Sequence, residues 1–294
     1  MQNIILFLAI ILLFISCTSD EVLVHPNEKK YDITSYLQEL DSSGDNINDD
    51  TLLFQIGYQN IYYGKYERGN ALIEYALSKR DTITDNDYHA WSVQNTKNGN
   101  YKIAIDKLEK AMMINPQRES GYYGWVLLYY YRDYKKALAI LEQQDAYTPD
   151  FSDAPVGEDI HYLKGLCLMQ LKNYQKAVTE FDTYINNLAR THGEDFVDVY
   201  TFVQKGRCLT QLGEFDKAIN SYKKAIKYYK ECTEAYYFMG LTQLEMNKKD
   251  SACINLNKAL NMIKKRYKSS DTYIEYFHEI YPQQIEENII KSCK

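Results

Sequence analysis

The sequence lacks several features that would indicate an enzyme or a nucleic-acid-binding protein. It contains no GxGxxG or P-loop sequence, and His278-Glu279 is not followed by the second histidine of a zinc-protease helix. The other histidines lie far apart, at His25, His89, His161 and His192. Lys and Arg number 34 against 40 Asp and Glu, so the net charge is −6. We therefore expect no catalysis, no cofactor, no metal site and no nucleic-acid partner, since phosphate recognition requires positive charge.

Cysteine motifs are also absent. Apart from Cys17, the chain has five cysteines and no CxxC pair; these are Cys167, Cys208, Cys232, Cys253 and Cys293. An odd number without paired spacing defines neither a disulfide framework nor a zinc site. The sequence leaves their pairing open.

The composition is that of an ordinary folded protein, with one unusual feature. Hydrophobic residues make up 45% and charged residues 25% of the chain, which is enough apolar surface for a sizeable core. Tyrosine stands out, with 29 residues. Such a number requires many half-buried positions at which the ring packs and the hydroxyl reaches water.

The first residues predict a targeting signal rather than part of the folded domain. The segment from Ile4 to Ile15 has no charged or strongly polar residue, which suits a signal-peptide core and is too short for a membrane-spanning helix. It ends in Phe14-Ile15-Ser16-Cys17, which resembles the lipobox of bacterial lipoproteins. The resemblance implies that Cys17 receives the lipid and becomes the mature N-terminus. The alternatives are a secreted chain without lipid, or an uncleaved anchor with a buried free cysteine.

Lipidation at Cys17 implies a protein anchored in a membrane by lipid and located outside the cytoplasm, at a periplasmic face or at the cell surface. The acidic residues in Thr18-Ser19-Asp20-Glu21 resemble the surface-export signal of lipoproteins from Bacteroidetes-type bacteria. The alternative is a solvated linker. We expect residues 18–49 to form a tether with one helix near residues 31–40, followed by a polar loop.

The middle of the chain repeats itself. Two stretches hold Tyr, Ala, Leu and Pro at identical offsets, namely Tyr101, Ala104, Leu108 and Pro116 against Tyr134, Ala137, Leu141 and Pro149. Further copies carry an aromatic residue, a small residue and a second aromatic residue, as in Tyr174, Ala177, Phe181 and in Phe215, Ala218, Tyr222. A glycine that allows two helices to approach closely stands nine residues before the first aromatic residue in three copies, at Gly57, Gly165 and Gly206.

This pattern resembles the tetratricopeptide repeat, a helix–turn–helix unit of 34 residues. About six copies begin near Asp50, Asp85, Arg118, Glu158, Val199 and Thr233, at spacings of 33 to 41 residues. The longer spacings place insertions near Asp150 and Arg190. The resemblance implies an all-α solenoid over residues 50–266, in which stacked pairs share one core and wind into a right-handed superhelix with a concave groove.

We expect residues 267–294 to cap the solenoid. Apolar residues recur between Asp271 and Ile290 at the spacing of an amphipathic helix, and Pro282 divides this stretch into two helices. A sharper alternative is that the segment folds back into the groove and competes with a ligand.

The resemblance further implies that the first helix of each pair lines the groove. Carried over to this sequence, the groove positions are Phe54, Tyr58, Tyr62, His89, Lys97, Tyr122, Tyr129, Tyr130, Tyr162, Gln170, Tyr200, Arg207, Tyr237 and Glu245. Any single tyrosine among them could instead pack against a neighbouring helix. For Tyr122, Tyr129 and Tyr130 we expect exposure, because Trp125, Leu127 and Leu128 supply the opposite face of that helix.

The expected function is that of a non-catalytic, lipid-anchored scaffold that binds a protein or peptide in its groove, since tyrosine offers a large contact area with few rotatable bonds. An accessory protein that binds glycans or nutrients through the same tyrosines is the alternative. A third hypothesis is an enzyme whose site is hidden in the insertions.

Overall fold

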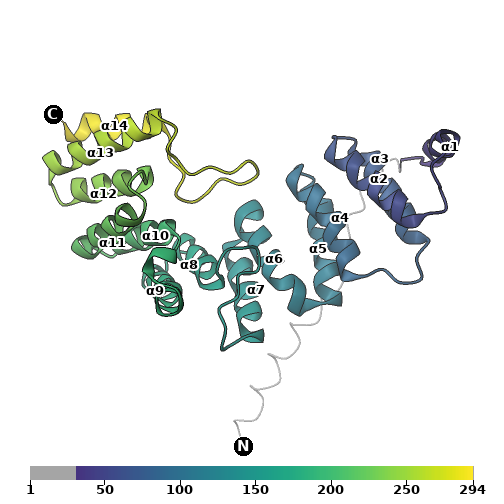
Figure 1. The fold of residues 1–294 in the computed structure, drawn as a ribbon, viewed down its shortest axis with the longest axis horizontal. Coiled ribbons are helices and arrows are strands. Elements are labelled where there is room, and N and C mark those ends of the chain that lie inside the picture. Colours follow the sequence, from purple (N-terminus) through teal and green to yellow (C-terminus); the bar gives the residue numbers. More distant parts are fainter. Residues whose placement is uncertain (1–30, 294) are drawn as a thin grey trace, which may run out of the picture. The chain divides into compact units, whose positions relative to one another are not determined.

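The computed structural model describes residues 31–293, and the signal sequence, Cys17 and the acidic tether lie outside this range. The described chain contains fourteen α-helices, one π-helical and one 3₁₀ segment, and no strand (Figure 1). It divides into two compact units, the first ending at Lys79 and the second beginning at Arg80. None of the helices within residues 31–293 combines the length and apolarity needed to cross a bilayer.

The first unit is a three-helix assembly, consisting of α1 (Thr34–Ser43), α2 (Asp50–Tyr62) and α3 (Tyr66–Ser78). Helix α2 begins after Asp49, whose side chain accepts a hydrogen bond from the backbone of Leu52 and satisfies a free helix-end donor. Tyr36 and Leu40 of α1 pack on the buried core of α2 and α3. Helix α1 therefore covers the apolar face that the first helix pair leaves open.

Two glycines bring α2 and α3 into backbone contact. A Cβ at Gly69 would lie 2.7 Å from the carbonyl oxygen of Gly57, and a Cβ at Gly57 would lie 2.9 Å from that of Gly69. Because both obstacles are helix backbone, no side-chain movement could relieve the clash. The glycine predicted to allow close helix approach at position 57 thus has a reciprocal partner at position 69.

The second unit holds five more helix pairs, with the same pair order as α2 and α3. Their first helices are α4 (Asp85–Lys97), α6 (Pro116–Val126), α8 (Ile160–Gln170), α10 (Val199–Gln211) and α12 (Thr233–Glu245). Their second helices are α5 (Tyr101–Ile114), α7 (Tyr134–Tyr147), α9 (Tyr174–Thr191), α11 (Phe215–Tyr228) and α13 (Lys249–Lys264). The last helix is α14 (Pro282–Ser292), and the 3₁₀ segment η2 (Glu194–Phe196) lies in the connection after α9.

The residues that recur from repeat to repeat pack where the two helices of a pair cross. The small residues of the second helices are all buried, namely Ala104, Ala137, Ala177, Ala218 and Ala252. The larger residues one turn later, such as Leu108, Leu141 and Phe181, are fully buried beside them. A Cβ at Gly165 would lie 2.5 Å from the Phe181 ring, so the glycine of the first helix accommodates the aromatic residue of the second. One hydrophobic cluster runs from Leu108 to Met239 and also takes in Ile274, and it forms a core shared by stacked pairs.

The third pair departs from regular α-helical geometry. After α6 the chain continues as a π-helical segment, η1 (Leu127–Tyr131), and Arg132 then takes a left-handed conformation with φ of 54°. A π-helical turn is wider than an α-helical one, so it changes which direction successive side chains face. The directions in which Tyr129, Tyr130 and Tyr131 point therefore cannot be predicted by continuing the α-helical period of α6.

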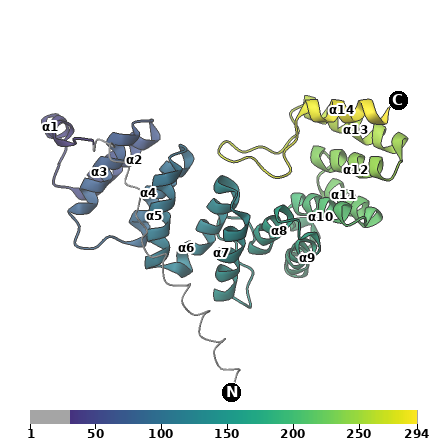
Figure 2. The same cartoon turned by 180° about the vertical axis from the view of Figure 1, so that it is seen from behind.

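The C-terminal region differs from the sequence-based expectation. Only α14 is helical, with Pro282 in its first turn, whereas residues 265–281 contain neither helix nor strand. We name residues 265–281 the strap. Two views show it leaving the end of α13, running out toward α6 and returning to α14 (Figures 1 and 2). The prediction of a helix on each side of Pro282 was therefore wrong for the first of the two.

A disulfide closes the region that contains the strap. Cys253 of α13 and Cys293 after α14 are bonded, at a sequence separation of 40. The inference that the cysteines define no disulfide framework thus missed one bond, because no local spacing marks two residues that meet through the packing of α13 and α14. The remaining described cysteines are free and buried, at Cys167, Cys208 and Cys232.

Candidate functional site

The candidate site is the face that the first helices of the second unit present to the strap. The strap contacts α12, α10, α4 and Arg132, which follows η1 in the continuation of α6. It contacts these helices by main-chain groups as well as by side chains. Residues 265–281 therefore lie back along the first helices, as the alternative expected, whereas α14 packs on α13 at the end of the solenoid, as a cap would.

Phe277 anchors the strap at the end of the third pair. Its ring lies 5.4 Å from that of Tyr129 and 6.0 Å from that of Tyr134, and the Arg132 guanidinium stands 4.6 Å from its centre. Arg132 also donates a hydrogen bond to the carbonyl oxygen of Glu275 at 3.1 Å. The left-handed turn at Arg132 therefore positions one guanidinium to contact both a ring and the backbone of the strap.

His278 is the second anchor, and α10 receives it. Its ring stacks on Tyr200 with centres 4.0 Å apart, and its Nδ1 lies 3.2 Å from Nε2 of Gln204. Arg207 donates to the carbonyl oxygen of Phe277 from the same helix. Burial, and the nearby positive charge of Arg207, lower the pKa of His278 to about 3. The ring is therefore neutral when it is seated.

The outgoing half of the strap is tied to α12 and reaches α4. The backbone N–H of Ser269 donates to Glu234 Oε1 at 2.7 Å, and Thr233 donates to the carbonyl oxygen of Tyr267. Near the turning point the Lys97 ammonium lies 4.8 Å above the Tyr273 ring. The strap thus spans several first helices rather than resting on one.

A buried carboxyl group lies next to the Phe277 anchor. Tyr129 donates a hydrogen bond of 3.4 Å to Glu158, which precedes α8. Burial, with smaller contributions from the negative charges of Asp198 and of Asp271 in the strap, raises the pKa of Glu158 to about 7. Glu158 therefore titrates near neutral pH.

Beyond the strap, the first-helix face remains open as a pocket of about 310 Å³ between α8, α10 and α12. Three of the predicted groove residues line it, namely Gln170, Arg207 and Glu245. Arg207 belongs both to this pocket and to the strap contact. A ligand in the pocket would therefore touch the same guanidinium that holds the strap.

The predicted groove residues fall into three groups. Phe54, Tyr58 and Tyr62 lie on α2 in the first unit, where Tyr62 is 57% exposed. In the second unit, those that the strap or the open pocket contacts are Lys97, Tyr129, Tyr200, Arg207, Gln170 and Glu245. The others pack within the stack: His89 bonds to buried Glu119 at 2.5 Å, Tyr122 and Tyr130 lie beside Trp125, and Tyr162 and Tyr237 are buried.

The expected exposure of the Tyr122, Tyr129 and Tyr130 cluster was wrong for Tyr129, which is only 3% exposed. Trp125 was assigned to the opposite face, yet its ring lies 5.5 Å from that of Tyr129 and 5.6 Å from that of Tyr130. The strap then covers Tyr129 with Phe277. Tyr122 and Tyr130 are half-buried. A helical wheel could anticipate neither the π-helical turn nor a contact with Phe277, 148 positions along the chain.

Sequence reasoning also missed Arg132, Gln204 and the strap residues Phe277 and His278. The adjacent rings in Tyr276-Phe277-His278 were visible, but they were assigned to a helix face rather than to an irregular segment. Arg132 carries no sequence signal, because its role depends on a left-handed turn that follows η1.

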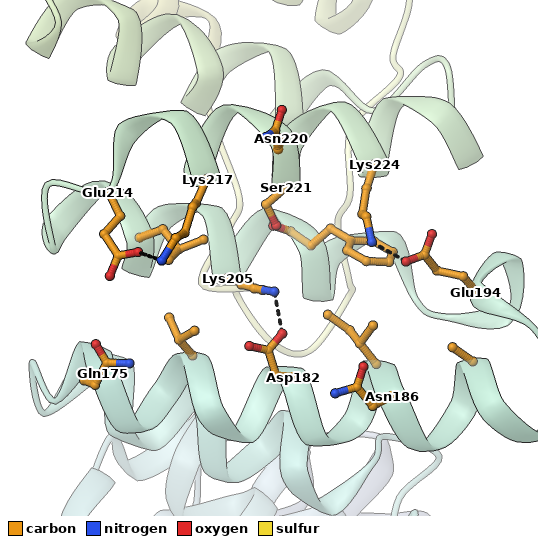
Figure 3. Close-up of a pocket in the computed structure, with 15 residues that line it drawn as sticks. Gln175, Asp182, Asn186, Glu194, Lys205, Glu214, Lys217, Asn220, Ser221 and Lys224 are labelled. Atoms are coloured by element: carbon orange, nitrogen blue, oxygen red, sulfur yellow. Dashed lines mark hydrogen bonds and ion pairs between the residues drawn. The ribbon is translucent and has the colours of Figure 1, made fainter.

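A larger pocket of about 450 Å³ lies away from the strap, between the second helices α9 and α11 with α10 behind them (Figure 3). Each lysine that lines it forms an ion pair with a carboxylate, in the pairs Lys205–Asp182, Lys217–Glu214 and Lys224–Glu194. These pairs neutralise the lining, so the pocket does not select a ligand of one charge. Among residues 31–293 no cluster of His, Cys, Asp and Glu could hold a metal ion.

Comparisons with known proteins support the repeat type. Models of the tetratricopeptide repeat match residues 206–247 and 233–266, and a model of subunit 3 of the anaphase-promoting complex (cyclosome) matches residues 97–184. The comparison with curated protein sequences gives no match.

Solved structures with a similar fold include a tetratricopeptide repeat protein from Parabacteroides merdae, with a TM-score of 0.54 and 15% identity over 88% of this chain and 91% of that one. MamA from Desulfovibrio magneticus RS-1 has a TM-score of 0.53 and 15% identity, over 64% of this chain and 99% of that one. The APC/C hetero-tetramer Cut9-Hcn1 has a TM-score of 0.54 and 11% identity, over 88% of this chain and 46% of that one. At such identities the likeness establishes the fold, an all-helical tetratricopeptide-repeat solenoid, and nothing more specific.

Proposed function

We propose that this solenoid of tetratricopeptide repeats is a non-catalytic scaffold, anchored by a lipid at Cys17, whose first-helix face binds a segment of a protein partner. The observation that carries the proposal is the strap itself. A non-helical segment of polypeptide lies across several first helices and is held through its backbone carbonyl groups and its rings. A face that accommodates one such segment has the chemistry to bind another.

The same observation gives less support to the carbohydrate alternative. Stacking on a sugar requires an exposed ring face, whereas on the face that the strap occupies Tyr129, Tyr162 and Tyr237 are buried and Tyr200 already stacks on His278. The pocket beside Arg207 combines polar side chains such as Gln170 and Glu245 with apolar ones such as Phe238 and Leu241, a mixture that suits a polypeptide segment. We therefore propose binding of a protein segment as the function of this face.

A site-specific cross-link tests this proposal. A photo-reactive residue at Gln170, in the open pocket, should capture a partner from envelope extract, whereas the same residue at Lys217 on the second-helix side should not. Lys217 is an exposed control on the same unit. Mass spectrometry of the cross-linked peptide would identify the contacting segment. Equal capture at both positions, or none at Gln170, would argue against the first-helix face as the binding surface.

The lipid anchor has its own test. Replacing Cys17 by Ser removes the thiol that a lipid would modify, so the Cys17→Ser protein should leave the membrane fraction and lose labelling by a radioactive fatty acid. The Ser16→Ala protein is the matched control and should keep both properties, because a small residue is retained before the cysteine. Continued labelling of Cys17→Ser would contradict lipidation at this position.

A further inference from the structure

The strap makes contacts that a separate polypeptide could reproduce. Arg132 and Arg207 bind the carbonyl oxygens of Glu275 and Phe277, two residues apart, and such contacts do not depend on the side chains of the bound segment. Specificity comes from two neighbouring rings, since Phe277 packs on Tyr129 and His278 stacks on Tyr200. The face is therefore adapted to a segment with two adjacent ring side chains and accessible carbonyl groups.

The closed arrangement leaves polar atoms unsatisfied where the strap meets the first helices. Nε2 of His278, Oε2 of Glu158 and Oε2 of Glu234 are buried without a hydrogen-bond partner. A buried polar atom without a partner opposes burial, because it forms hydrogen bonds with water once exposed. Opening the strap would let His278, which belongs to it, and Glu234, which the strap contacts through Ser269, bond to water instead.

Both ends of the strap are fixed independently of the contacts of Phe277 and His278. It emerges from α13 and returns to α14, and the Cys253–Cys293 disulfide joins these helices. Ile280 and Ile285 pack into the cluster formed by Leu256 and Ala259 of α13. This linkage gives the strap a high effective concentration at the face. Ile274 of the strap is also buried in the hydrophobic cluster of the solenoid, so a partner must displace this contact as well.

We propose that the strap is a displaceable internal ligand: it occupies the binding face in the resting protein and competes with a partner segment that carries two adjacent rings, such as Phe277-His278. This inference rests on the proposed function, whose binding face it specifies. A partner enters by replacing the strap on Arg132, Arg207, Tyr129 and Tyr200 and by extending into the pocket beside Arg207.

A fluorescent peptide with the sequence of residues 270–281, SDTYIEYFHEIY, provides the probe. We expect weak binding to the unchanged chain and at least tenfold tighter binding to a Phe277→Ala/His278→Ala chain, whose strap no longer competes. Adding Arg132→Ala should remove that gain. Thr272→Ala is the matched control within the strap, because Thr272 is exposed, and it should leave the affinity unchanged. A peptide with both rings replaced by alanine should not bind.

Hydrogen exchange on the unchanged chain avoids any effect of substitution on folding. Excess peptide should accelerate exchange at Tyr273–Glu279 while α13 and α14 keep their protection. Equal peptide affinity in all chains, no binding to any of them, or no change in strap exchange would overturn the inference. Peptide binding with no partner cross-linked at Gln170 would instead count against the proposed function alone. A partner captured equally with and without the peptide would refute the internal ligand and leave the scaffold standing.

Discussion

Replacing Cys253 and Cys293 by serine should weaken the attachment of α14 by about 4 kcal/mol. The bond closes a loop with a sequence separation of 40, and a cross-link of that span restricts the detached state by an amount between the values for loops of 15 and 100 residues. Loss of the bond should make α14 and the strap detach more often. Hydrogen exchange of α14 amides, compared with that of α10 and α11 in the same samples, measures the change.

The single substitutions serve as controls for this prediction. Cys253→Ser and Cys293→Ser each break the same bond, so each should show nearly the full effect, and the double variant should add little. A reducing agent should reproduce the effect in the unchanged chain and have no effect on the double variant. Unchanged protection of α14 after loss of the bond would mean that the apolar cluster with Leu256 and Ile285 alone determines its stability.

Acid should release the strap through His278. The seated ring has a pKa of about 3, because burial and the charge of Arg207 disfavour the imidazolium, whereas a released ring titrates near its ordinary value of 6.5. The seated state therefore has its full stability above pH 6.5 and loses it as the pH falls toward 3. Between pH 6.5 and 5 the loss amounts to about 2 kcal/mol.

The pH dependence that His278 contributes must be separated from that of other groups by comparing variants. Tyr200, Gln204 and Arg207 face His278 from α10, and Tyr276 faces it from the strap. Glu158, with a pKa raised to about 7, has the opposite effect in the same range: its contribution to stability is present below about pH 4.5 and is lost as the pH rises through 7.

The His278→Phe variant keeps a flat ring at position 278 but cannot be protonated there, and it retains the pH dependence that Glu158 contributes. It therefore serves as the reference. Strap exchange in the unchanged chain should rise relative to this variant as the pH falls from 6.5 to 5. Parallel pH profiles would show that His278 does not control the strap.

The repeat sequence predicted the architecture well because each repeat depends on local rules. The expected starts at Asp50, Asp85, Val199 and Thr233 are the first residues of α2, α4, α10 and α12. Small residues at the crossings, such as Ala177, and glycines such as Gly165 are buried where the pattern placed them. Helix periodicity and side-chain volume determine such contacts between chain neighbours.

The candidate site could be predicted only in part. Repeat position alone placed Tyr200 and Arg207 on the groove side of α10, and both contact the strap. Tyr129 was predicted to be exposed, but residues far along the chain bury it. Repeat position therefore indicates which helix faces the groove, whereas it does not indicate what occupies the groove.

By itself, the sequence determined the helix pairs, their stacking order and the small residues at their crossings, because these depend on spacing within about 40 residues. The tertiary structure alone decided the path of the strap, the pairing of Cys253 with Cys293 and the turn that directs Arg132 to Phe277. These features arise from contacts between segments up to 176 residues apart, as between Lys97 and Tyr273. No local periodicity encodes such contacts, since they form only once the solenoid has provided a face on which the strap can lie.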